Sequence, residues 1–380
     1  MKTSVQRSIS RILCAVSVVA IGMTQAVAQD GITRTEITLG QSMDQSGPDG
    51  SREKLVKQGA DQYLKYVNRK GGVNGRKIRV ISLDNKGAIE NTVADVTRLV
   101  ETEKVFALFL VSGTGDLAAV LPYVEQQKVP LLGVTAGSDT LHKPHPYLFH
   151  YKGGHADEMK RVAAHLEATG NERVGVIYLK NEFGNEGLAA AESEFAKRNL
   201  EIVARAGVAE GASDYTAAVK AVADARPQAV VLISVQGPAP AIVKAYRALD
   251  QSAWLYGLSV LDSDSMHQAL GDKARGMIIS QTVPYPWDRA DRVAAEYRSV
   301  MNSIGVKDLS VAGMEGFIAA RMLVKGLKTA GTSPTRETFA KVLASSAAQN
   351  PGSYGFSSND RGATHFAGIT VIGDGGRLMY

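Results

Sequence analysis

A glycine turn between an apolar strand and a helix is the first candidate site in the sequence. Residues 109–124 read FLVSGTGDLAAVLPYV and contain Gly113-x-Gly115-x-x-Ala118, a variant of the fingerprint that holds the pyrophosphate of a dinucleotide. Asp139 follows at about the distance where that fingerprint places an acid for the ribose. These residues raise the hypothesis of a nicotinamide-dependent enzyme.

The order of the predicted strands argues against a dinucleotide. The fingerprint normally follows the first strand of a nucleotide-binding unit, but Val105–Val111 is the third apolar strand of the mature chain. The ribose acid should close the next strand, Leu131–Val134, yet Thr135 stands there and Asp139 comes later. We therefore expect no nucleotide and no other cofactor.

The same turn suits a small carboxylate. Ser112 and Thr114 place hydroxyls at the start of a helix, where free backbone N–H groups favour an anion. The next strand also ends in polar residues, which include Thr135, Ala136 and Ser138. The alternative interpretation is that these hydroxyls only cap helices. Two such loops on neighbouring strands favour ligand binding.

Further candidate residues follow strands in the second half of the chain. Phe183 could present its ring to a ligand, or pack at the start of a helix. Gln236 and Asp262 lie in two other loops that follow predicted strands, although a solvated loop is the ordinary place for an acid. Ligands of open parallel sheets bind beyond the carboxyl ends of the strands, which is where all three residues are expected.

Two successive arrays of alternating strands and helices predict the fold. Strands are expected at 37–39, 78–83, 105–111 and 131–134, and again at 174–179, 202–208, 229–234 and 255–258. Segments with helical periodicity separate them, and two more helices are expected at 289–304 and 312–330. The pattern predicts an α/β protein with two doubly wound parallel-sheet lobes.

The amino terminus has the pattern of a secretory signal. Three basic residues precede an apolar run from Ile12 to about Met23, and Ala26-Val27-Ala28 provides the small residues of a cleavage site. We predict cleavage after Ala28 and a periplasmic location. Removal of the signal lowers the net charge from +5 to +2. Neither net charge suggests nucleic-acid binding, and the sequence does not show the concentrated basic face that such binding favours.

Motifs for catalysis and metal binding are missing from the sequence. Cys14 is the only cysteine and lies in the predicted signal, so the mature chain has no thiolate nucleophile and no cysteine metal ligand. The histidines between His142 and His155 lack the HExxH spacing, and no G-x-S-x-G is present. We expect neither an enzyme nor a metal protein. An exported hydrolase would need a nucleophile and base that the sequence does not offer.

The mature chain resembles the leucine/isoleucine/valine-binding family of type I periplasmic binding proteins. The resemblance rests on several stretches in the family's order, of which GADQYLKYVNRKGGVNGRKIRVISLDNKG (residues 59–87) is the most specific. ITLGQSMDQSGPDG, VGVIYLKNEFGNEGLAA, DYTAAVKAVADARPQAVVL and GSYGFSSNDRGAT are the others, together with the stretch around the glycine turn.

The resemblance implies two lobes joined by three crossings around a small ligand. Residues 29–150 and 284–350 would form lobe 1, and residues 151–283 and 351–380 would form lobe 2. It also implies that Ser112, with Thr135, Ala136 and Ser138, contacts the ligand carboxylate and that Phe183 covers the ligand. Phe183 lacks the hydroxyl of the tyrosine that amino-acid binders usually carry there.

The family's acid for the ligand ammonium has no clear match. Ser259-Val260-Leu261 occupies that region and the nearest acid is Asp262. Either Asp262 pairs the ammonium of a branched-chain or other aliphatic amino acid, or the ligand is an aromatic or other carboxylate without an ammonium. The implied partner is the membrane permease of an ABC importer, with the chain itself monomeric. A ligand sensor with the same fold is the remaining alternative.

Overall fold

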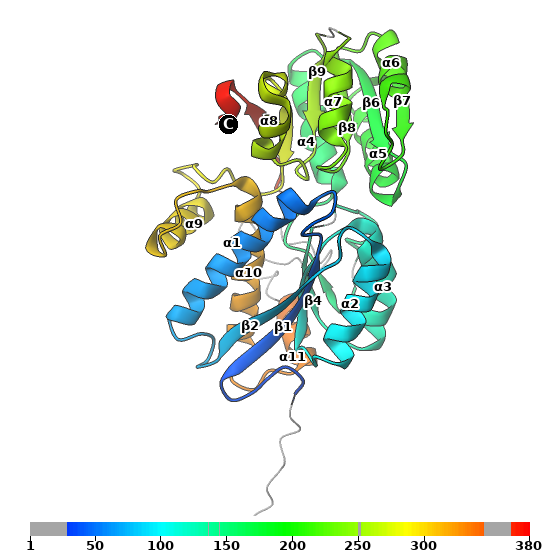
Figure 1. Cartoon of the computed structure of the whole chain (residues 1–380). Helices are drawn as coiled ribbons and strands as arrows, with labels where there is room; N and C mark the ends of the chain where they lie inside the picture. Colours follow the sequence, from blue (N-terminus) through cyan, green and yellow to red (C-terminus); the bar gives the residue numbers. More distant parts are fainter. Residues whose placement is uncertain (1–28, 136, 144, 250–251, 346–365) are drawn as a thin grey trace, which may run out of the picture.

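The computed structural model describes residues 29–135, 137–143, 145–249, 252–345 and 366–380. Two sheets, one above the other in Figure 1, each form the centre of a lobe. The predicted cleavage site after Ala28, the residue Ala136 and the GSYGFSSNDRGAT stretch all lie outside the described residues.

The first sheet is parallel throughout and has the strand order β2-β1-β3-β4-β5. Its strands are β1 (Glu36–Met43), β2 (Lys77–Asp84), β3 (Ala107–Val111), β4 (Leu131–Val134) and β5 (Leu148–Phe149). Every residue of β3 and β4 is buried, as expected for a parallel strand that is covered on both faces. The four longer strands occupy the predicted segments, whereas the short β5 was not predicted.

Helices from both ends of the chain cover this sheet. One face packs against α2 (Ile89–Glu101) and α3 (Thr114–Gln126). The other face packs against α1 (Gly50–Arg69), α10 (Val311–Thr329) and α11 (Arg336–Ser345), and α9 (Arg292–Ser303) contacts α1 at the side. The helices after residue 284 therefore belong to the same core as the first 150 residues.

The second sheet has the order β12-β11-β10-β9-β8-β6-β7. Its parallel strands are β6 (Arg173–Leu179), β7 (Glu201–Val208), β8 (Ala229–Ile233), β9 (Trp254–Gly257) and β10 (Ile278–Gln281). The carboxyl-terminal strands β11 (Gly368–Ile372) and β12 (Leu378–Met379) extend the sheet in the antiparallel sense. The sequence did not predict β10, β11 or β12.

Helices also cover both faces of the second sheet. The helices α4 (His155–Ala168) and α5 (Glu182–Ala196) pack on one face. The helices α6 (Thr216–Asp224), α7 (Ala239–Arg247) and α8 (Ser263–Leu270) pack on the other. Short 3-10 turns at Gly271–Ala274 and Asp374–Gly376 complete the lobe.

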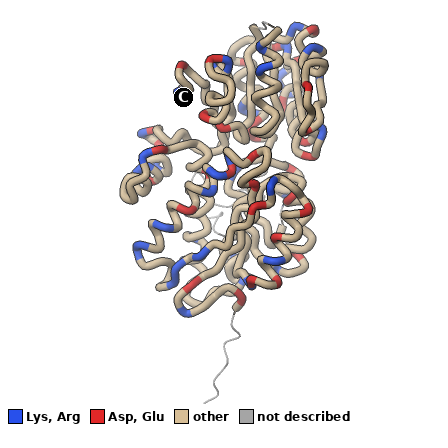
Figure 2. The backbone as a smooth tube through the Cα atoms, viewed as in Figure 1, with Lys and Arg blue, Asp and Glu red and all other residues tan. Residues whose placement is uncertain are grey.

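The chain passes between the lobes three times. It crosses after β5 and again after β10, and a third change of lobe follows from the described elements, since α11 packs in the first lobe and β11 in the second. The predicted class, two doubly wound lobes with three crossings, is confirmed. Figure 2 shows basic and acidic residues interspersed over both lobes, and within the described ranges no helix has the length and apolarity needed to span a membrane.

The helices α1 and α10 pack unusually closely because three glycines lie at their interface. A Cβ atom on Gly59 would lie 1.8 Å from the backbone oxygen of Gly313, and one on Gly316 would lie 1.8 Å from the oxygen of Val56. This approach fixes α1, whose amino-terminal turn reaches the junction of the lobes (Figure 1). The helix pair therefore positions the residues of α1 that form part of the site described next.

Candidate ligand-binding site between the lobes

A cavity of about 270 Å³ lies between the lobes, beyond the carboxyl ends of the first sheet's strands. Residues of both lobes line it, in agreement with the strand-end rule for open sheets. The first lobe contributes Asp44, Pro48, Asp49, Arg52, Glu53, Asn85, Gly87, Ile89, Ser112, Gly113, Thr114, Gly115, Asp116 and Thr135. The second lobe contributes Asn181, Glu182, Phe183, Glu210, Val235 and Val260.

The glycine turn from β3 to α3 forms one wall of the cavity. Gly113 has φ +91°, and a Cβ atom there would lie 2.1 Å from Oδ2 of Asp116, so only glycine fits. Thr114 is the first residue of α3, which leaves the backbone N–H groups of the helix start at the cavity wall. The turn predicted from the sequence is therefore an open helix end beside a cavity.

The three predicted hydroxyls Ser112, Thr114 and Thr135 all line the cavity and are nearly inaccessible to solvent. Oγ of Ser112 accepts a hydrogen bond of 2.9 Å from the backbone N–H of Asp44. The Oγ1 atom of Thr114 is buried and has no hydrogen-bond partner within the described structure. A hydroxyl in that state is a group that a bound ligand could satisfy.

The other predicted residue of this lobe that the structure describes has a local role. Oγ of Ser138 accepts the backbone N–H of Leu141 at 3.2 Å, and Ser138 does not line the cavity. Ala136 lies outside the described residues.

In the second lobe, the predicted residues separate into one that reaches the cavity and two that do not. Phe183 lines the cavity, and its ring meets that of His155 edge to face at 4.8 Å between centroids. Oε1 of Gln236 accepts the backbone N–H of Asp262 at 2.7 Å. Asp262 itself caps α8 through the N–H of Ser265 at 2.8 Å, and neither Gln236 nor Asp262 is among the lining residues.

Sequence reasoning missed the acids of the cavity. Six carboxylates line it, against the single cation Arg52, namely Asp44, Asp49, Glu53, Asp116, Glu182 and Glu210. Asp44, Asp49 and Glu182 fall in loops that follow predicted strands, where the strand-end rule places ligands. The rule marks the loop but not the side chains within it that face the ligand.

Two of these acids also hold the first lobe's loops. Asp44 accepts the N–H groups of Gly47 at 2.5 Å and Asp49 at 2.8 Å, which fixes the turn into α1. Asp116 accepts the hydroxyl of Thr92, so it ties α3 to α2. Burial raises the pKa of Asp116, a change that the hydrogen bond from Thr92 partly opposes.

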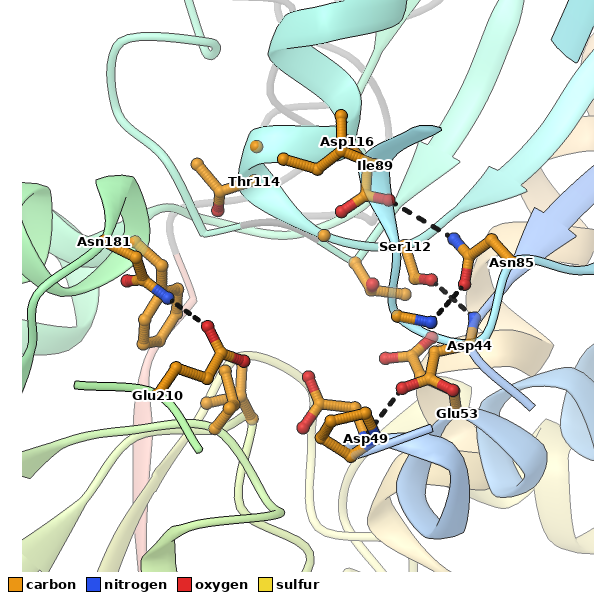
Figure 3. A pocket seen from close by; sticks show the side chains of 18 of the residues that line it. Asp44, Asp49, Glu53, Asn85, Ile89, Ser112, Thr114, Asp116, Asn181 and Glu210 are labelled. Atoms are coloured by element: carbon orange, nitrogen blue, oxygen red, sulfur yellow. Dashed lines mark hydrogen bonds between the residues drawn. The ribbon is translucent and has the colours of Figure 1, made fainter. Parts of the chain in front are cut away.

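Asp49 and Glu210 come from opposite lobes and face one cavity (Figure 3). Asp49 precedes the first residue of α1, and its Oδ1 atom is buried with no hydrogen-bond partner within the described structure. Burial, reinforced by the nearby charge of Glu53, raises the pKa of Asp49 to about 7. Glu210 accepts a hydrogen bond of 2.7 Å from Nδ2 of Asn181, a neutral partner.

The one cation of the cavity is already neutralised. Arg52 forms ion pairs with Glu53 at 2.8 Å and with Glu315 of α10 at 2.6 Å. Glu315 also accepts Nζ of Lys152 at 3.2 Å and the hydroxyl of Tyr151, both in the first crossing between the lobes. Burial raises the pKa of Glu315, but Arg52 and Lys152 outweigh it and bring the pKa to about 2.

The histidines after α3 pack with one another and with the backbone. His142 and His150 stack at 3.8 Å between ring centroids, and the nitrogens of His142 lie 2.6 Å from the oxygen of Ser138 and 3.0 Å from that of Lys152. Within the residues that the structure describes, no three histidine, cysteine or acidic side chains form a group that could hold a metal ion.

Two α/β lobes that enclose a ligand-sized cavity define a solute receptor. The chain belongs to the periplasmic binding protein family, whose model matches residues 36–377, and within it to the leucine/isoleucine/valine-binding type. This membership confirms the resemblance found in the sequence. Proteins of the family bind solutes in the periplasm and are not enzymes.

One curated relative and two solved structures are similar to this chain. The leucine-specific-binding protein of Salmonella typhimurium is 22% identical over 73% of this chain and 74% of its own length. A substrate-binding periplasmic protein from Ralstonia solanacearum has a TM-score of 0.82 and 28% identity, over 90% of this chain and 99% of its own. A fatty acid ABC transporter substrate-binding protein from Thermomonospora curvata has a TM-score of 0.81 and 19% identity, over 92% of each chain.

Proposed function

We propose that this protein is the substrate-binding component of an ABC importer and that its ligand is an α-amino acid. In this proposal the mature chain, cleaved after Ala28, acts as a monomer in the periplasm and delivers its ligand to a membrane permease. The names of the relatives support a transport role but differ in the ligand, since one binds leucine and another is called a fatty acid transporter component.

One observation carries the choice of ligand class, namely that the cavity has a donor side and an acceptor side. On the donor side, the open start of α3 and the unpartnered hydroxyl of Thr114 suit a carboxylate, and Ser112 and Thr135 lie beside them. On the acceptor side, the carboxylates of Asp49 and Glu210 suit an ammonium. A zwitterion satisfies both sides at once.

The acceptor side disfavours a ligand that is only an anion. A fatty acid or another carboxylate without an ammonium would add negative charge among six acids that have one already paired arginine. In this proposal Asp49 pairs with the ligand ammonium, the role for which the sequence analysis had considered Asp262. The apolar walls, which include Ile89, Phe183 and Val260, would hold the carbon chain of the ligand.

The lobes already meet at the edges of the cavity. Pro48 of the first lobe lies against Gly237 of the second, where a Cβ atom would come within 2.9 Å of the proline ring. Helices α3 and α5 also contact each other across the junction. This arrangement corresponds to a closed form, which a hinge motion at the crossings would open for the ligand.

Calorimetric titration of the mature protein tests the ligand class with matched pairs. The α-amino acids that raise the melting temperature in a screen are titrated beside their des-amino analogues, for example leucine beside 4-methylpentanoate. We expect saturable binding by at least one amino acid and at least tenfold weaker binding by its des-amino partner. Equal or tighter binding of the des-amino acid, or of a fatty acid, would overturn the proposal.

The transport role needs a test in cells, because a sensor could use the same pocket. Deletion of the gene should abolish high-affinity uptake of the labelled ligand and leave ligand-dependent gene expression unchanged. Normal uptake with a lost transcriptional response would instead identify a sensor.

A further inference from the structure

The charge of the cavity exceeds what one ammonium can balance. Arg52, Lys152, Glu53 and Glu315 form a buried network with two positive and two negative groups. Five lining acids remain outside it, and no lysine, arginine or histidine of the described part forms an ion pair with any of them. These acids are Asp44, Asp49, Asp116, Glu182 and Glu210.

Neutral donors satisfy some of these carboxylates without removing their charge. Backbone N–H groups bond to Asp44, a hydroxyl bonds to Asp116, and the amide of Asn181 bonds to Glu210. Burial raises the pKa of Asp49, Asp116 and Glu182, so the ionised form of these three acids is disfavoured where they lie. A cation in the cavity would relieve this cost.

Two buried atoms independently mark the cavity as a place for a ligand. Thr114 is only 5% exposed and lines the cavity, and its hydroxyl has no partner within the described residues. Oδ1 of Asp49, on the acid side, is also buried and unpartnered there. A ligand with hydrogen-bonding groups at both positions would satisfy these two atoms.

From this arrangement we infer that the ligand is an α-amino acid with a second cationic group at the end of its side chain, held near Glu210 and Asn181 of the second lobe. The inference rests on the proposed function. The α-carboxylate would lie at the start of α3 and the α-ammonium beside Asp49. The alkyl part of the side chain would run along Phe183 and Val260, as long basic side chains do on apolar surfaces.

Lysine and norleucine form the decisive pair, because they share the α-amino acid head and a straight side chain, and norleucine lacks the terminal ammonium. Ornithine, arginine and glutamine extend the series. We expect lysine, ornithine or arginine to bind at least tenfold more tightly than norleucine in calorimetric titrations of the mature protein.

The variant Glu210→Gln tests whether Glu210 causes the preference for lysine over norleucine. Glu210→Gln should reduce the lysine-to-norleucine affinity ratio severalfold, since the amide keeps the shape and loses the charge. Glu172→Gln serves as the matched control, because Glu172 is an exposed acid of the same lobe that does not line the cavity. Thermal unfolding confirms that both variants are folded.

The outcomes separate this inference from the proposed function. Norleucine or leucine binding as tightly as every basic amino acid would overturn the inference and leave the proposed function standing. An unchanged ratio in Glu210→Gln would overturn the assignment to Glu210. Failure of every α-amino acid to bind would overturn the proposed function and this inference with it.

Discussion

Arg52 on α1 donates a hydrogen bond of 2.6 Å to Glu315 on α10, and the two residues are separated by 263 positions in the sequence. Both side chains are almost completely buried. Because Arg52 also pairs with Glu53 at the cavity and Glu315 with Lys152 in the first crossing, this ion pair joins the ligand cavity to that crossing between the lobes. Its loss should therefore affect both stability and binding.

Glu315→Gln should destabilise the protein strongly. The substitution removes the acid that Arg52 and Lys152 share, and breaking a buried ion pair costs about 3–5 kcal/mol. Urea denaturation measures the loss. Glu337→Gln is the control, because its pair with Lys341 is exposed and should contribute little. A loss no larger than the control's would contradict a stabilising role for the buried network.

The lowered pKa of Glu315 predicts that the free energy of unfolding decreases in acid. The pKa of Glu315 is lowered from 4.5 to about 2, so its contribution is fully present above about pH 4.5 and disappears as the pH falls towards 2. A shift of this size corresponds to about 3 kcal/mol. Asp49, whose pKa is raised, acts in the opposite direction and mainly between pH 4 and 7. Urea midpoints at pH 4.5, 3.5 and 2.5 should fall in the wild type and fall less in Glu315→Gln.

Gly59→Ala tests whether close packing positions α1. Alanine is the better helix former by about 1 kcal/mol, so stability would rise if the site had space. A Cβ atom would instead lie 1.8 Å from a backbone oxygen of α10, and overpacking of this kind costs about 1–3 kcal/mol or more. We expect a net decrease in the melting temperature, whereas Lys54→Ala on the exposed face of α1 should have little effect.

The sequence predicted the longer strands of both sheets because buried parallel strands are continuous apolar runs, as in Ala107–Val111. It could not show the ion pair of Arg52 with Glu315, since nothing local relates residues so distant in sequence. It also did not show which residues of a strand-end loop face the cavity. Ser138 and Asp262 accept backbone N–H groups three residues ahead, a local choice that competes with ligand contact. The acids that line the cavity were missed because the sequence does not show which side chains of a loop face the ligand.

Thr114→Val separates ligand contact from helix capping. The Oγ1 atom of Thr114 has no partner in the described structure, so valine, which has nearly the same shape, removes no hydrogen bond and should leave stability unchanged or slightly higher. If the hydroxyl binds the ligand carboxylate, affinity should fall by about 1.5–3 kcal/mol. Calorimetric titration and thermal unfolding of one preparation measure both quantities.

Ser112→Ala is the contrasting variant. The hydroxyl of Ser112 already accepts the buried N–H of Asp44, so its removal should cost about 1–3 kcal/mol of stability as well as affinity. For the Thr114→Val variant, the contradicting outcome is different. If that variant lost stability and kept its affinity for the ligand, Thr114 would have a purely structural role.

Ligand binding should release protons near neutral pH. Burial and the neighbouring Glu53 raise the pKa of Asp49 to about 7, so a large share of the free protein carries a proton there at pH 7. A ligand ammonium beside the carboxylate favours the ionised form and lowers its pKa, so the proton leaves on binding. Affinity for the amino acid should consequently rise between pH 5.5 and 8 and level off above the pKa of Asp49.

Titrations in two buffers of different ionisation enthalpy measure the protons released directly. Asp49→Asn should abolish the release and flatten the pH dependence, and it should also weaken binding because the ammonium loses a charged partner. Lys54→Ala, on the exposed face of α1, should retain the full pH dependence. Proton release that persists in Asp49→Asn would place the titrating group elsewhere in the cavity, among the acids that Asp49 faces.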